Sequence, residues 1–149
     1  MPQTLTLPTF TLENGTTLRD VPVAYQTWGS LNAAGTNAVL ACHALTGDTD
    51  VADWWNGLLG PGRALDPTDD FVVCLNVPGS PYGSVSPLTE NPESGEPYGA
   101  AFPVFTTRDT VHLHRRALEQ LGVRRVACAI GGSMGGMHVL EWAFETTDD

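Results

Sequence analysis

The sequence predicts an α/β fold, in which an antiparallel N-terminal ribbon leads into a parallel sheet with crossover helices. Three runs are apolar without a break: 38–42 (AVLAC), 71–75 (FVVCL) and 126–130 (VACAI). Such runs indicate strands that are buried on both faces, as in a parallel sheet covered by helices. A helical pattern separates the second run from the third, and this order is typical of a right-handed crossover. Two alternating segments precede all of these and predict the ribbon.

The ribbon is expected at residues 4–12 and 21–28. In 4–12 (TLTLPTFTL), Leu and Phe alternate with Thr, which is the period of a half-buried strand. Asn14-Gly15 is a strong signal for a hairpin turn, and 21–28 is then the returning strand. Residues 29–37 are expected to form a loop that leads to the first buried strand.

The helix between the second and third apolar runs is expected at 108–121. Its apolar residues recur at helical spacing, and Gly122 follows as the residue that ends it. Thr106 or Thr107 can cap its start. A second helix should follow the third strand.

Two long loops, 43–70 and 76–103, follow the first two buried strands. Connections in α/β units are normally a few residues long. Loops on the carboxyl side of parallel strands are where such sheets bind ligands. The first loop has room for a short helix around 51–59. Aromatic residues in both loops argue against disorder.

Composition limits the class of protein. The chain has 149 residues, 42% of them hydrophobic, which fits one globular domain or a piece of one. A net charge of −10 argues against nucleic acid or an anionic membrane as a partner. There is no signal-peptide pattern and no run of the roughly 20 apolar residues that a spanning helix needs. Cys42, Cys74 and Cys128 lie in apolar runs, so buried free thiols in a cytoplasmic protein are expected.

A single serine stands among glycines directly after the third strand. Residues 131–135 (GGSMG) fit the motif G-x-S-x-G, with a buried strand before it and an amphipathic segment after it. Such a turn holds the serine in a strained conformation, and side chains at Gly131 and Gly135 would collide with neighbouring chain. We therefore predict that Ser133 is a nucleophile, close to the free N–H groups of the next helix. The alternative is a glycine-rich turn of a nucleotide-binding fold, although no G-K-[ST] follows. No metal site is expected.

A serine needs a base to remove its proton, and the chain has four histidines. His138 lies five residues beyond Ser133 on the same helix and cannot reach its hydroxyl. His112 and His114 are expected to be surface or packing residues of another helix. His43 follows a strand that can lie beside the serine strand. It is a weak candidate for the base and a better one for a residue that shapes its loop.

Five stretches carry a resemblance to a known family: 42–55 (CHALTGDTDVADWW), 60–66 (GPGRALD), 74–87 (CLNVPGSPYGSVSP), 97–103 (PYGAAFP) and 130–143 (IGGSMGGMHVLEWA). They resemble the N-terminal part of the homoserine O-acetyltransferase family, which are acyltransferases of the α/β-hydrolase fold, and the fungal members above all. The chain is thus expected to be the N-terminal portion of an α/β-hydrolase fold that ends after the helix following the nucleophile.

The resemblance implies an activity and its residues. Ser133 would take an acetyl group from acetyl-CoA and pass it to the hydroxyl of L-homoserine, a step of methionine biosynthesis. The backbone amides of Met134 and Leu45 would form the oxyanion hole. Acetyl-CoA would be a co-substrate, with no permanently bound cofactor, and the complete protein would be a homodimer.

The resemblance also implies that residues 1–149 are an incomplete domain. In the family, the catalytic aspartate and histidine, the lid and the later strands come from the second half. We therefore expect the 149 residues alone to be inactive and marginally stable. The loop at 77–87 departs from the bacterial pattern of the family. The acceptor can accordingly be deacetylcephalosporin C or L-serine instead. A serine ester hydrolase of the same fold and a non-catalytic fragment are the remaining alternatives.

Overall fold

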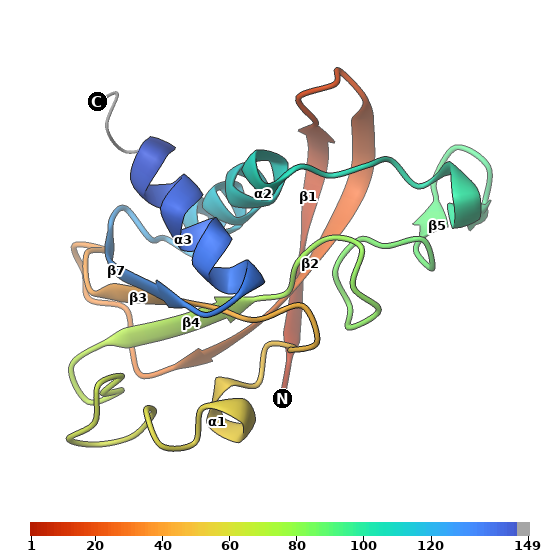
Figure 1. Ribbon diagram of the computed structural model, residues 1–149. Coiled ribbons are helices and arrows are strands. Elements are labelled where there is room, and N and C mark those ends of the chain that lie inside the picture. The colour runs from red at the N-terminus through yellow and green to blue at the C-terminus, as the bar shows by residue number, and fades with distance from the viewer. Residues whose placement is uncertain (146–149) are drawn as a thin grey trace.

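A five-stranded mixed sheet runs through residues 1–145, the part of the chain that the computed structural model describes (Figure 1). Its strand order is β1-β2-β4-β3-β7. The strands are β1 (Gln3–Thr11), β2 (Thr17–Trp28), β3 (Ala38–Cys42), β4 (Phe71–Leu75) and β7 (Val126–Gly131).

The predicted antiparallel ribbon is confirmed in β1 and β2. Leu5, Leu7 and Phe10 of β1 are buried while its threonines are exposed, because alternate side chains of a strand point to opposite faces. Gly15 ends the turn between the strands with a φ of +86°. The ribbon is part of the main sheet, since β2 also pairs antiparallel with β4.

Strands β4, β3 and β7 form the predicted parallel part of the sheet. All of β3 and nearly all of β4 are buried, as their unbroken apolar sequences predict. Burial raises the pKa of the Cys42 thiol to about 12 and also raises that of Cys74. The expected burial of β7 and of Cys128 was wrong: Cys128 is exposed, because β7 is an edge strand within residues 1–145.

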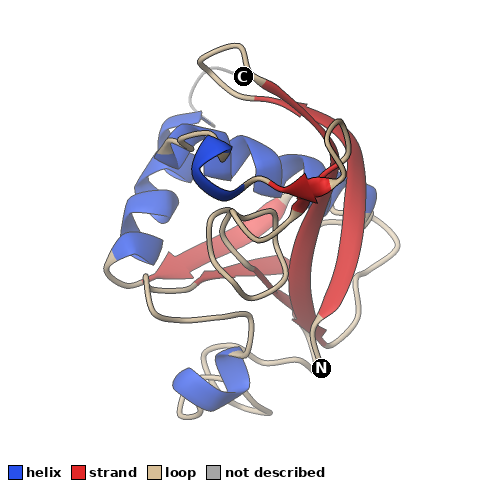
Figure 2. Ribbon diagram, turned by 90° about the vertical axis from the view of Figure 1, so that its right-hand side faces the viewer, coloured by secondary structure: helices blue, strands red, loops and turns tan. Residues whose placement is uncertain are grey.

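Helices cover one face of the sheet and a long loop covers the other (Figures 1 and 2). Helices α2 (Thr107–Gln120) and α3 (Met134–Glu145) pack together on the first face. Helix α1 (Val51–Trp54) lies on the second, where Val51 packs against buried residues of β3 and β4. Within residues 1–145, no helix is long and apolar enough to cross a membrane.

The ends of α2 agree with the sequence. Of the two threonines proposed as caps, Thr106 fills the position: its hydroxyl accepts from the Asp109 N–H at 3.0 Å. The Asp109 carboxylate accepts from the Thr106 N–H in return, which completes a capping box. Gly122 follows the helix with a φ of +88°, as expected for a residue that ends it.

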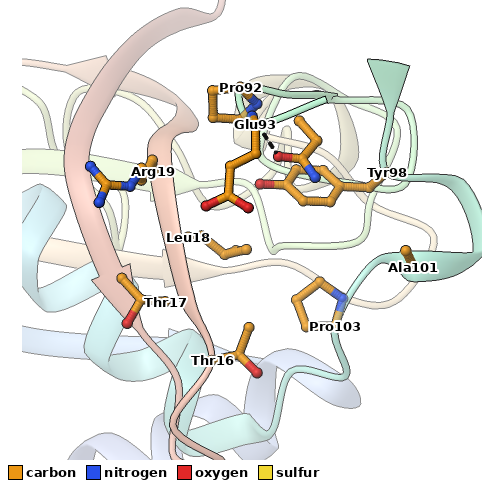
Figure 3. Close-up of a pocket in the computed structure, with 10 residues that line it drawn as sticks. Thr16, Thr17, Leu18, Arg19, Pro92, Glu93, Tyr98, Ala101 and Pro103 are labelled. Atoms are coloured by element: carbon orange, nitrogen blue, oxygen red, sulfur yellow. Dashed lines mark hydrogen bonds between the residues drawn. The ribbon is translucent and has the colours of Figure 1, made fainter. Parts of the chain in front are cut away.

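A small hairpin lies within the second long loop and was not predicted. It consists of β5 (Glu90–Asn91) and β6 (Glu96–Pro97), followed by the 3-10 helix η1 (Gly99–Ala101). A hollow of about 170 Å³ lies between this region and residues 16–19 at the start of β2, and Figure 3 shows the side chains that line it. The side chains of Glu93 and Tyr98 line it, and neither Ser133 nor its flanking glycines take part.

The edge position of β7 predicts how residues 1–149 behave when they are produced alone. Ala127 and Cys128 are exposed on an apolar strand whose outer edge is unpaired within residues 1–145, which is a template for edge-to-edge association. We expect this polypeptide to self-associate in size-exclusion chromatography with light scattering, and Ala127→Lys to reduce the effect by placing a charge on the edge. A cooperatively melting monomer would contradict this expectation.

Candidate active site

Ser133 stands on a strained turn between β7 and α3. Its φ is +56°, in the left-handed region that non-glycine residues rarely adopt. This conformation costs about 1–2 kcal/mol, so the surrounding structure must impose it. The strain that the G-x-S-x-G motif predicts is therefore confirmed. Ser133 is exposed, and its hydroxyl has no hydrogen-bond partner within residues 1–145.

Two glycines allow the turn to pack against the end of β3. A Cβ on Gly135 would lie 2.1 Å from the Cys42 carbonyl oxygen and 2.9 Å from that of His43. A Cβ on Gly131 would lie 2.5 Å from the backbone of Gly135. Both approaches involve backbone atoms that cannot turn aside, so the predicted steric requirement at these two positions is confirmed.

The end of β3 brings a second turn to the serine. Cys42 is in register with Gly131, so the chain that follows β3 starts beside the serine turn. Residues 44–47 form a tight turn, closed by a 2.9 Å hydrogen bond from the Gly47 N–H to the Ala44 carbonyl. Leu45 lies at its tip and is exposed.

The two predicted oxyanion donors are free to meet a ligand. Within residues 1–145, neither the Leu45 N–H nor the Met134 N–H donates a hydrogen bond to the chain. Met134 is the first residue of α3, where N–H groups have no partner inside the helix. The helix dipole adds a partial positive charge at the same end. Negative charge that develops on an atom bound to Ser133 would be stabilised here.

His43 is not placed to act as the base for Ser133. It is buried, with Nδ1 2.8 Å from the Ala44 carbonyl oxygen and Nε2 3.3 Å from the Val77 N–H. Both ring nitrogens are therefore engaged by backbone groups. Burial lowers the pKa of His43, which favours the neutral ring that this pattern requires. These contacts support the interpretation of His43 as a residue that shapes its loop, and not as the base.

Two more histidines are buried, one on each of the two helices that pack together. His114 of α2 and His138 of α3 meet edge to face, with ring centroids 6.5 Å apart. Burial, reinforced by His138, lowers the pKa of His114 to about 3, and burial also lowers that of His138. His114 is the packing residue that the sequence allowed. His112 is half-buried near the surface, with Nε2 2.8 Å from Glu145 Oε2.

The low pKa of His114 predicts acid sensitivity. Its pKa is about 3 in the fold and about 6.5 in the unfolded chain, so the unfolded chain binds the extra proton between these values. Stability is complete above pH 6.5 and falls as the pH drops towards 3, by about 2 kcal/mol from this residue at pH 5. We expect urea unfolding of the full-length protein to show this loss between pH 7.5 and 5. The variant His114→Gln, which can still donate to the Asn76 carbonyl, should show a smaller loss; an equal loss would contradict the assignment.

One buried polar residue of the site was missed by the sequence analysis. Asn76 follows β4 and is fully buried, and neither polar atom of its side chain has a hydrogen-bond partner among residues 1–145. Its backbone carbonyl lies 3.3 Å from His114 Nε2. In the sequence it looks like the first residue of a loop, and only the packing of α2 over the strand end shows that it is buried.

Known proteins share both the sequence and the fold. A family model described as alpha/beta hydrolase fold matches residues 37–148. Homoserine O-acetyltransferase of Salinibacter ruber is 85% identical over 149 residues, covering 100% of this chain and 42% of that protein. The chain therefore spans less than half the length of this curated relative.

Two solved structures are similar at the same level of identity. The homoserine O-acetyltransferase from Bacillus anthracis has a TM-score of 0.89 and 31% identity, covering 98% of this chain and 43% of that one. Esterase E22 has a TM-score of 0.85 and 31% identity, covering 96% of this chain and 43% of that one. Structural similarity alone thus fits both a transferase and a hydrolase.

Proposed function

Because the chain belongs to the α/β-hydrolase fold family, we propose that it carries the nucleophile side of an acyltransferase active site, with Ser133 as the nucleophile. The predicted fold class is confirmed by this family match and by the similar structures. The observation that carries the proposal is the strained, exposed Ser133 at the start of α3. Acetyl transfer to homoserine is favoured because the chain is 85% identical to a protein named homoserine O-acetyltransferase.

In the proposed reaction, the Ser133 hydroxyl attacks the carbonyl carbon of the acetyl thioester of acetyl-CoA. The carbonyl oxygen becomes negative and is bound by the N–H groups of Leu45 and Met134. The C–S bond then breaks, the CoA thiol leaves with a proton, and acetyl-Ser133 remains. The hydroxyl of homoserine attacks this ester, so that O-acetylhomoserine forms and the serine recovers its proton.

Proton transfer in both steps needs a base. Within residues 1–145, no histidine bonds to the Ser133 hydroxyl, and both nitrogens of His43 are occupied. We propose that the rest of the full-length protein supplies the histidine and aspartate, as the family resemblance implies. Residues 1–149 are then one part of the domain. The homodimer and the cytoplasmic location stay predictions from the same resemblance.

The test compares acceptors on the full-length protein. Purified protein is incubated with acetyl-CoA and with homoserine, serine or deacetylcephalosporin C, while CoA release and product mass are followed. We expect the highest turnover with homoserine and a single acetyl adduct in intact-mass analysis without an acceptor. If turnover is highest with another acceptor, that acceptor replaces homoserine in the proposal, and the acyl-serine chemistry is retained.

Ester hydrolysis is the second candidate function, because esterase E22 matches the structure nearly as well as the transferase does. Water and an alcohol compete for the same acyl-serine, so the partition between them decides the class. Hydrolysis of a nitrophenyl acetate, measured with and without homoserine, separates the two. A hydrolase would release acetate at a rate that homoserine does not change, whereas a transferase would divert the acetyl group to homoserine.

A further inference from the structure

His43 links the turn that carries Leu45 to the end of strand β4. Its ring is almost fully buried, at 1% exposure, directly after β3. On one side Nδ1–H donates to the Ala44 carbonyl at 2.8 Å. On the other side Nε2 accepts from the Val77 N–H at 3.3 Å. One imidazole therefore connects the chain segments that follow two neighbouring strands.

The Ala44 carbonyl accepts both hydrogen bonds that hold the turn. It accepts the Gly47 N–H at 2.9 Å, which closes the turn, and it also accepts the His43 ring. The ring lies against the turn, since a Cβ on Gly47 would lie 3.0 Å from the His43 Cβ and 3.4 Å from Nδ1. Leu45 at the tip is 74% exposed, so its side chain contributes little packing to hold the turn. The imidazole therefore supplies the buried contact that holds the turn.

We propose that His43 is a positioning residue, whose imidazole holds residues 44–47 where the Leu45 N–H meets the acyl oxygen bound at Ser133. This inference rests on the proposed function for its catalytic consequence, and on the two hydrogen bonds for its structural part. An oxyanion donor acts only if it is fixed in place before the reaction, because no free energy is then spent on orienting it. A displacement of about 1 Å is enough to lower the rate by about 100-fold.

Substitutions at His43 separate its two hydrogen bonds. Asparagine places an N–H donor near Nδ1 and retains the bond to Ala44, whereas glutamine places an oxygen near Nε2 and retains the bond to Val77. Leucine retains neither. We expect kcat of acetyl transfer to fall by about 100-fold in His43→Leu with KM for acetyl-CoA changed less than threefold. His43→Asn should retain more activity than His43→Gln, because it keeps the bond that supports the turn.

His138→Asn is the matched control. His138 is also a buried histidine of low pKa, but within residues 1–145 it makes no hydrogen bond to the turn. This variant should melt at a lower temperature and keep kcat within about twofold when it is assayed well below that temperature. If His138→Asn loses as much kcat as His43→Leu, the effect is general damage to the core and the proposal is overturned.

Hydrogen–deuterium exchange of the same full-length variants tests the structural part without any activity. We expect amide exchange in residues 44–47 to rise at least about tenfold in His43→Leu and to stay near the wild-type rate in His138→Asn. Unchanged exchange in His43→Leu would overturn the inference. If exchange is faster in His43→Leu but the wild-type protein transfers no acetyl group, the proposed function fails and the positioning of the turn stands.

Discussion

Replacing Ser133 by alanine in the full-length protein is expected to lower acetyl transfer by at least about 10⁴-fold and to abolish the acetyl adduct. The substitution removes the hydroxyl oxygen that forms the covalent intermediate in the proposed reaction, while the N–H groups around it stay in place. In a serine protease, loss of the nucleophile costs about 10⁶-fold in kcat, and the residual rate comes from oxyanion stabilisation and binding. Stopped assays of CoA release and intact-mass spectra measure the two effects.

A second variant at the same position separates the chemistry from backbone strain. Ser133→Gly also lacks the hydroxyl, but glycine adopts a φ of +56° without the cost that alanine bears there. Both variants should be inactive, and Ser133→Gly should melt no lower than Ser133→Ala. An acetyl adduct that survives in either variant would show that another residue is the nucleophile.

Replacing Gly135 by valine is expected to abolish activity and to destabilise the fold by at least about 3 kcal/mol. The new Cβ would have to occupy a position 2.1 Å from the Cys42 carbonyl oxygen, and the atom it meets belongs to a buried strand. The strand end and the helix must separate, which costs more than ordinary overpacking of flexible side chains. Separation would also move residues 44–47 away from Ser133, so activity is lost in any molecules that fold.

The next residue provides a matched control. A Cβ on Gly136 would lie 3.4 Å from the Gly131 carbonyl oxygen, which is ordinary contact, and alanine favours a helix interior. Gly136→Ala should therefore fold and retain activity, whereas Gly135→Ala should already lose most of both. Thermal melts and transferase assays of the two alanine variants compare them directly. Equal behaviour of the two would show that the close approach to β3 is not required.

The sequence predicted the local elements of the fold well, because each has a pattern of its own. Alternation marked β1, unbroken apolar runs marked β3 and β4, and the caps of α2 were visible in Thr106 and Gly122. Pairing between distant strands has no such pattern. The antiparallel pairing of β2 with β4 follows from packing, and the two-residue strands β5 and β6 are too short for any period to show.

At the candidate site, the sequence identified the residues and the structure determined their environment. The motif around Ser133 predicted strain and the need for Gly131 and Gly135, since steric rules at a tight turn are local. It did not reveal the tautomer of His43, which follows from the hydrogen bond that the Val77 N–H donates to Nε2 from the loop after β4. Cys128 was misjudged because burial of an apolar strand depends on whether a neighbour covers it, and within residues 1–145 none pairs beyond β7.

The pairing of β3 with β7 also fixes when the serine turn can form during folding. The ribbon of β1 and β2 closes over a short hairpin, so it can assemble as soon as the first 30 or so residues leave the ribosome, on a microsecond scale. Strand β7 pairs with β3, although more than half of the chain lies between the two strands in the sequence. Contacts of such sequence separation form late, because loop closure must come first. The strained Ser133 geometry is therefore assembled later during synthesis than the ribbon of β1 and β2. A nascent chain halted before β7 would hold a formed ribbon and lack the serine turn.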